Sequence, residues 1–214
     1  MAKPDQKQLY KFAGRCAVSR KMADEAYIPG YSPYMPIINN LTIKLRPLPR
    51  DMISKPAVFS ACRQKRYWLP RDLSDGAGRH VLWTMMNPSR ADETCNDATT
   101  TMTTNVSRRH GYDVHGVVNL SAAIEADSTR LTAGDGAADV VNEQAIRRAV
   151  KWIQRNHGDI VVAWGASRHL RQREAAVVSL LRHHNLLCHG QNADGSPRFP
   201  RAIRRDVTFS AFNR

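Results

Sequence analysis

The stretch from Val81 to Met86, VLWTMM, is a largely apolar run that stops abruptly at Asn87-Pro88-Ser89. A short run of this kind predicts a fully buried strand. Proline has no N–H for the sheet ladder and favours extended geometry in the residue before it, so the strand is expected to end there. In open α/β sheets, ligands bind beyond the carboxyl ends of the strands. The polar residues that follow, up to Thr99, are therefore the first candidates for a binding site.

Further apolar runs alternate with amphipathic stretches along the rest of the chain. Buried strands are expected at 81–86, 114–120, 159–164 and 186–189, and helices at 97–110, 138–156 and 170–184. Asn96 or Asp97 is expected to cap the first of these helices. Strands that alternate with helices predict an α/β fold of three layers, with a parallel-centred sheet flanked by helices. A basic hairpin over 57–73 and a last strand over 207–212 are expected to extend this sheet.

The first quarter of the chain has a different pattern. Apolar residues at helical spacing predict an amphipathic helix over 5–26, and three prolines and three tyrosines make 27–36 a connector. An alternating segment over 39–49 predicts a short strand. We therefore expect an N-terminal helical extension over 1–54 and an α/β domain over 55–214.

The chain carries 32 Lys and Arg residues against 19 Asp and Glu residues, a formal net charge of +13. This excess favours a polyanionic partner, and nucleic acid, DNA before RNA, is the first candidate because Arg and Lys release counterions from phosphates. Four widely spaced cysteines favour reduced thiols, and we see no membrane span and no secretory leader. We expect a cytoplasmic protein that binds no membrane. The sequence leaves its oligomeric state open.

Turn-forming or polar residues close each of the four predicted core strands. If these strands are parallel neighbours, their ends meet at one edge of the sheet. A pocket there suits a planar polar ligand such as a nucleobase. Its rim would contain Asn87, Ser89, Asp92, Asp97, Thr99, Asn119, Trp164 and Gly165. The candidate phosphate-contacting residues are Arg90, Arg108, Arg109, Arg168, Arg171, Arg198 and Arg201.

A string of short motifs resembles one family. The motifs are N-P-S-R-A-D at 87–92, N-D-A-T at 96–99, G-Y at 111–112, V-V-N-L at 117–120, A-W-G at 163–165 and G-x-P-R-x-P at 195–200. Together they resemble a bacterial and phage family catalogued as domain of unknown function DUF1643, over about residues 57–200. The family pattern places functional positions on Asn87, Ser89, Asp92, Asp97, Thr99 and Asn119. Here Ala98 replaces the usual Pro and Phe199 the usual His, so a final catalytic imidazole is missing.

The order of the turns is also similar to that of the uracil-DNA glycosylase superfamily, although no G-Q-D-P-Y motif is present. This resemblance implies a glycosylase-like fold and a base flipped out of the nucleic acid. Asn87 or Asp97 would then act on a water molecule, Asn119 would read the base, and the loop that contains Pro197 would press on the backbone. Asp92 completes the catalytic candidates.

The sequence therefore favours an enzyme that excises or modifies a base in nucleic acid, with no cofactor and no metal ion. Two alternatives are a DNA- or RNA-binding module without chemistry, as in phage–host conflict, and a nucleotide-processing enzyme. Each candidate also has a structural interpretation. Asn87 can close the strand end, Asn119 can satisfy backbone groups in a turn, and Asp97 can act only as a helix cap.

Overall fold

The computed structural model describes residues 48–73, 78–132, 134–135, 137, 139–202 and 208–213. The predicted helix over 5–26, the connector over 27–36 and most of the predicted strand over 39–49 lie outside the described residues. The described part begins with residues that pack onto the α/β domain. Leu48 and Met52 are buried in its core, and Arg148 Nη1 donates to the carbonyl oxygen of Pro49 at 2.7 Å.

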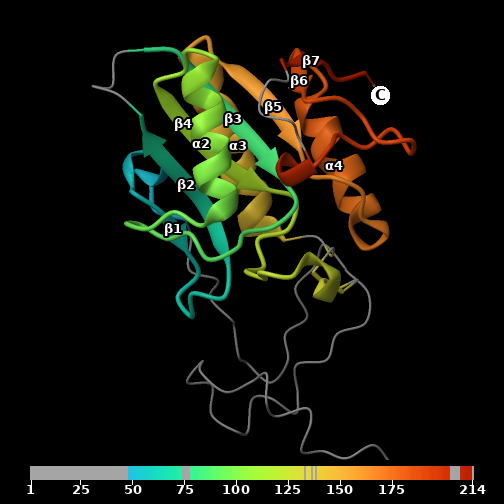
Figure 1. Cartoon of the computed structure of the whole chain (residues 1–214). Helices are drawn as coiled ribbons and strands as arrows, with labels where there is room; N and C mark the ends of the chain where they lie inside the picture. The colour runs from blue at the N-terminus through green and yellow to red at the C-terminus, as the bar shows by residue number, and fades with distance from the viewer. Residues whose placement is uncertain are drawn as a thin grey trace, which may run out of the picture. The chain divides into compact units, whose positions relative to one another are not determined.

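The strands of the described residues form one sheet in the order β1-β2-β4-β3-β5-β6-β7 (Figure 1). Their bounds are β1 (Val58–Phe59), β2 (Arg66–Asp72), β3 (His80–Met85), β4 (Val114–Asn119), β5 (Asp159–Ala163), β6 (Leu186–Cys188) and β7 (Ser210–Ala211). β4, β3, β5 and β6 are parallel, whereas β2 and β7 pair antiparallel at the two sides. The predicted parallel-centred sheet is therefore confirmed.

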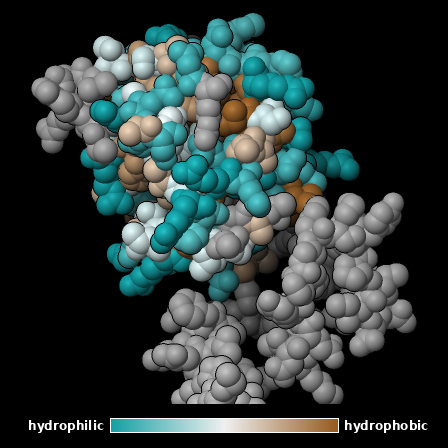
Figure 2. Space-filling view, turned by 90° about the vertical axis from the view of Figure 1, so that its right-hand side faces the viewer, coloured by the Kyte–Doolittle hydropathy of each residue, from teal (hydrophilic) through white to brown (hydrophobic). Residues whose placement is uncertain are grey.

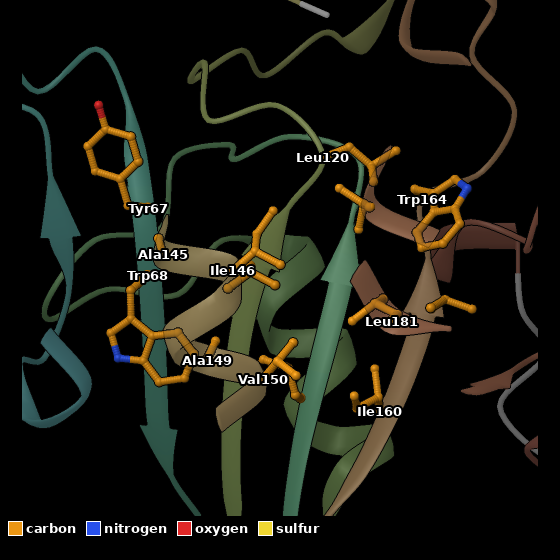
Figure 3. Packing of buried hydrophobic residues seen from close by; sticks show 14 of the residues in the cluster. Tyr67, Trp68, Leu120, Ala145, Ile146, Ala149, Val150, Ile160, Trp164 and Leu181 are labelled. Carbon is orange, nitrogen blue, oxygen red and sulfur yellow. The ribbon is translucent and has the colours of Figure 1, made fainter. Parts of the chain in front are cut away.

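Helices cover both faces of this sheet. They are α2 (Ala98–Arg109), α3 (Val140–Arg155) and α4 (Arg171–Leu181), with 3-10 turns η2 (Met52–Ser54), η3 (Ser128–Arg130), η4 (Arg168–Leu170) and η5 (Pro200–Ala202). Successive residues of β3 point to opposite faces, as strand geometry requires. Leu82 packs with Ile146 of α3 in one core cluster, and Trp83 packs with Val106 of α2 in the other. Figure 3 shows the first cluster, in which Ile146 of α3 lies over the sheet and Leu181 of α4 lies beside Ile160.

Helix α2 is rich in threonine, a residue that disfavours helix interiors because its hydroxyl competes for backbone groups. In α2 the threonine hydroxyls bond to carbonyl oxygens of the helix itself. Thr103 Oγ1 and Thr104 Oγ1 both donate to the carbonyl oxygen of Thr100, at 3.1 and 2.9 Å. Asp97 caps the helix by accepting from Thr100 N at 2.7 Å, as the sequence predicts. The polar face of α2 can therefore be buried against the sheet.

The face of the described part that lies beside α4 and β7 is mainly hydrophilic. Figure 2 shows hydrophobic residues on the face beside α4 and β7 only in small patches. Among the described residues, no helix has both the length and the apolar character needed to cross a membrane.

A buried hydrogen-bonded chain joins α2 to the sheet. Trp83 Nε1 donates to Ser107 Oγ at 3.0 Å, and Ser107 Oγ lies 3.0 Å from His115 Nδ1. Ser107 Oγ has one proton and two lone pairs, so it can accept from the indole and still bond to His115 Nδ1 in either ring tautomer. Burial, followed by the charges of Arg71 and Arg108, lowers the pKa of His115 to about 3, so the imidazole is neutral at pH 7.

This lowered pKa predicts acid sensitivity of the fold. A histidine in the unfolded chain takes up a proton near pH 6.5, whereas folded His115 resists it until about pH 3. The free energy of unfolding should therefore fall as the pH drops between these values, by about 1.4 kcal/mol per pH unit from this residue. Urea unfolding at several pH values measures the slope. His115→Gln should reduce the slope by that amount, whereas the exposed control His169→Gln should leave it unchanged. An equal slope in both variants would contradict the assignment.

Candidate functional site

The connections of the sheet reverse between two neighbouring strands. The chain leaves β3 toward α2 on one face, and it leaves β5 toward α4 on the other face. The arrowheads of β3 and β5 point to the same edge in Figure 1. Such a switch point leaves a crevice beyond the strand ends, where α/β proteins bind ligands.

A pocket lies at this edge and is lined by several segments that are distant in sequence. Its cavity volume is about 30 Å³. A water molecule needs roughly 10–15 Å³, so the cavity has room for water rather than for a base. The lining residues are Arg66, Met85, Asn87, Ser89, Asp97, Thr99, Thr100, Glu125, Ala126, Ser128, Phe199 and Arg201.

Asn87 is held in one orientation by two carbonyl groups. Its Nδ2 donates to the carbonyl oxygen of Pro88 at 2.9 Å and to that of Glu125 at 2.7 Å. Both amide protons are therefore used. Asn87 Oδ1 accepts no hydrogen bond from the residues that the structure describes, so this oxygen is a fixed acceptor available to the pocket.

The carboxylate of Asp97 is occupied by backbone donors. One oxygen accepts from Thr100 N, and the other accepts from Arg90 N at 3.1 Å and Ala91 N at 3.3 Å. Burial raises the pKa of Asp97, but these bonds and the charge of Arg66 lower it by more, so the net shift is downward. Asp97 is therefore ionised and acts as a helix cap that also fixes the turn after β3.

Arg66 brings a buried positive charge to the pocket. Its side chain is only 3% exposed, and its Nη1 donates to the carbonyl oxygen of Ala91 at 2.7 Å. Burial lowers the pKa of Arg66 to about 10, with Asp97 acting in the opposite direction, so the guanidinium stays charged at neutral pH. Arg71, near the end of β2, stabilises the same loop, because its Nη2 donates to the carbonyl oxygen of Asp92 at 2.6 Å.

Glu125 contributes a second carboxylate to the pocket from the loop after β4. Its backbone N donates to the carbonyl oxygen of Pro88 at 3.0 Å, in exchange for the bond from Asn87. Its Oε1 accepts from Asp127 N at 2.9 Å. No described residue donates to Glu125 Oε2, so this oxygen is available as a hydrogen-bond acceptor.

The segment that follows β6 forms the remaining wall. Gly165 N donates to the carbonyl oxygen of Pro197 at 2.8 Å, which fastens this segment to the end of β5. Gly165 has φ +73°, and a Cβ there would lie 3.1 Å from Phe199 Cβ. The close approach brings Phe199 and Arg201 to the pocket, with the guanidinium of Arg201 5.7 Å from the centre of the Phe199 ring.

The structure brings only part of the predicted site together. Asn87, Ser89, Asp97, Thr99 and Arg201 line the pocket. Asp92 lies outside it, where its Oδ1 accepts from Cys95 N at 2.8 Å in a surface turn. These backbone bonds lower the pKa of Asp92.

Two other predicted ligand contacts are core residues. Asn119 is 2% exposed, and its carbonyl oxygen accepts from Asn142 Nδ2 at 3.0 Å. Trp164 is 1% exposed and donates from Nε1 to Glu174 Oε1 at 2.8 Å. Together with Gly165 and Pro197, these residues support the walls of the pocket without lining it.

The arginines divide between the two edges of the sheet. Those after the carboxyl ends of β3, β5 and β6 lie at the edge of the pocket; they are Arg90, Arg168, Arg171, Arg198 and Arg201. Arg108 and Arg109 lie in the last turn of α2, at the opposite edge. Among the described residues, no group of three or more His, Cys, Asp or Glu side chains is arranged to hold a metal ion.

The sequence does not mark Arg66 and Glu125 as site residues. Arg66 stands in a run of basic residues that predicts a positively charged hairpin. It is buried because it begins β2, in which the first four residues are buried on both faces of the strand. Glu125 lies in a loop whose sequence has no helix or strand periodicity. The position of Glu125 depends on the hydrogen bonds that it exchanges with Asn87 and Pro88. Phe199 is visible in the sequence only as a departure from the family pattern.

The role of Asp97 as a cap predicts a cost in stability. Asp97→Ala removes the acceptor for Thr100 N, Arg90 N and Ala91 N, and should lower the free energy of unfolding by roughly 1–2 kcal/mol. Chemical denaturation measures the change. Glu125→Gln, which removes a charge from the same pocket but keeps an acceptor for Asp127 N, should stay within about 0.5 kcal/mol of the original protein. Equal stability of both variants would show that Asp97 is not a structural cap.

Comparison with known proteins agrees with the motif string. Residues 66–201 match the family described as protein of unknown function (DUF1643). The match extends from the start of β2 to η5 and includes every residue that lines the pocket. No curated protein and no solved structure matches the chain. Since the matched region makes up more than half of the sequence, the chain belongs to the DUF1643 family.

Proposed function

We propose that the protein is an enzyme that acts on a base of a nucleic acid, DNA in the first place, and that it cleaves the bond between base and sugar as DNA glycosylases do. The observation that carries the proposal is the fixed Oδ1 of Asn87, in a pocket that also contains a carboxylate and an aromatic ring. The reaction class comes from the resemblance in the order of the turns to the uracil-DNA glycosylase superfamily.

The chemistry of the lining suits a base. Asn87 Oδ1 can accept from an amino or imino group, and the hydroxyls of Ser89, Thr99 and Ser128 can donate or accept. Phe199 offers a ring on which a base can stack. Because the cavity is about 30 Å³, a base can enter only when its lining moves apart, and in this proposal the segment from Pro197 to Arg201 moves outward. In this proposal Asn87 takes the place of Asn119 as the residue that faces the ligand.

The charge at the same edge suits the rest of a polynucleotide. Arg90, Arg168, Arg171 and Arg198 are exposed beyond the strand ends, close in the fold to the pocket that Arg201 lines. Arginines at such positions can contact the phosphates on either side of a flipped nucleotide. The net charge of +13 adds a general attraction to nucleic acid.

The test is incubation of the purified protein with unmodified and base-modified DNA and RNA, followed by mass spectrometry of released bases and remaining nucleosides. The original protein should release or alter a base. Asn87→Ala should lower the rate by about 100-fold or more, because it removes the fixed acceptor at the reacting group. The matched control is Asp92→Ala, which lies in a surface turn outside the pocket and should retain activity within about two-fold.

Binding to the same oligonucleotides separates this proposal from a binding module. Asn87→Ala should bind with nearly the original affinity, and that affinity should fall steeply with salt. Unchanged nucleosides for every substrate, together with salt-sensitive binding, would contradict an enzyme and favour a non-catalytic module.

A further inference from the structure

We infer that Glu125 is the general base of this reaction, and that it activates a water molecule held between its Oε2 and Asn87 Oδ1. The inference rests on the proposed function and names a catalytic residue that the motifs of the sequence do not indicate. It follows from which acceptors in the pocket are already occupied and which are not.

The other two carboxylates of this region are committed to the backbone. Asp97 accepts from Thr100 N, Arg90 N and Ala91 N, so it has little basicity left for a water molecule. Asp92 forms a turn with Thr94 N and Cys95 N, and it does not line the pocket. Glu125 is the carboxylate that both lines the pocket and has an oxygen without a donor among the described residues.

The backbone couples Glu125 to Asn87. Asn87 Nδ2 donates to the carbonyl oxygen of Glu125 at 2.7 Å, and Glu125 N donates to that of Pro88 at 3.0 Å. These two bonds hold the end of β3 and the loop after β4 in a fixed relation. Asn87 and Glu125 consequently line the same cavity, and its volume of about 30 Å³ accommodates a water molecule.

The proposed step balances as a hydrolysis. The water oxygen forms a bond to C1′ of the sugar, and one water proton passes to Glu125 Oε2. The bond between C1′ and the base nitrogen breaks, and its electron pair stays on the base, which takes up a proton from solvent. Glu125 then returns its proton to solvent. The other charged groups that line the pocket are Arg66, Asp97 and Arg201.

The experiment measures base release by Glu125→Gln on the substrate that the original protein cleaves. We expect kcat to fall by about 100- to 10,000-fold, the usual contribution of a general base, with KM changed by less than about three-fold. Glutamine keeps the acceptor for Asp127 N, so thermal unfolding should be unchanged. Formate added to Glu125→Ala should restore part of the activity, because it can enter the vacated volume and accept the proton.

The matched control is Asp127→Asn. Asp127 is an exposed carboxylate two residues along the chain, and only its backbone N contacts Glu125. This variant should retain the original kcat. If Glu125→Gln is as active as the original protein, the inference is overturned while the proposed function stands. If the original protein releases no base from any nucleic acid, the proposed function fails and Glu125 loses the assignment with it.

Discussion

The pocket exists because two neighbouring parallel strands send the chain to opposite faces of the sheet. After β3 the chain turns toward α2, and after β5 it turns toward α4, so neither connection covers the space between the two strand ends. Loops from β4 and β6 then enclose that space. The bonds between Asn87 and Glu125, and the bond from Gly165 N to the carbonyl oxygen of Pro197, fasten these loops to the strand ends. Loss of the parallel order of β3 and β5 would separate every group in the pocket.

Positive charge has two different uses in this molecule. Arg66 and Arg71, which belong to the predicted basic hairpin, bind carbonyl oxygens of the loop after β3 and stabilise its shape. Arg63 also contacts this loop, through a two-pronged ion pair with Glu93 at 2.7 and 2.8 Å. These arginines are therefore structural partners of the pocket. The exposed arginines beyond β3, β5 and β6 remain the candidates for phosphate contacts.

Much of the fold follows from the sequence because its signals are local. Apolar runs ending in Asn87-Pro88, Asn119 and Gly165 mark the core strands, and Asp97 before a run of threonines marks the start of α2. The meeting of strand ends at one edge follows from the βα alternation. The sequence does not show which hydrogen bonds each side chain makes. Asp97 and Glu125 are both carboxylates near a strand end, and only the backbone donors that surround Asp97 make it a cap.

The central claim is that this edge of the sheet receives a base. A crystal structure of Glu125→Gln with an oligonucleotide tests it most directly. We expect an extruded base between Asn87 and Phe199, an outward shift of the segment from Pro197 to Arg201, and phosphates beside Arg198 and Arg201. Nucleic acid bound instead along Arg108 and Arg109, with the pocket as small as it is here, would contradict the account.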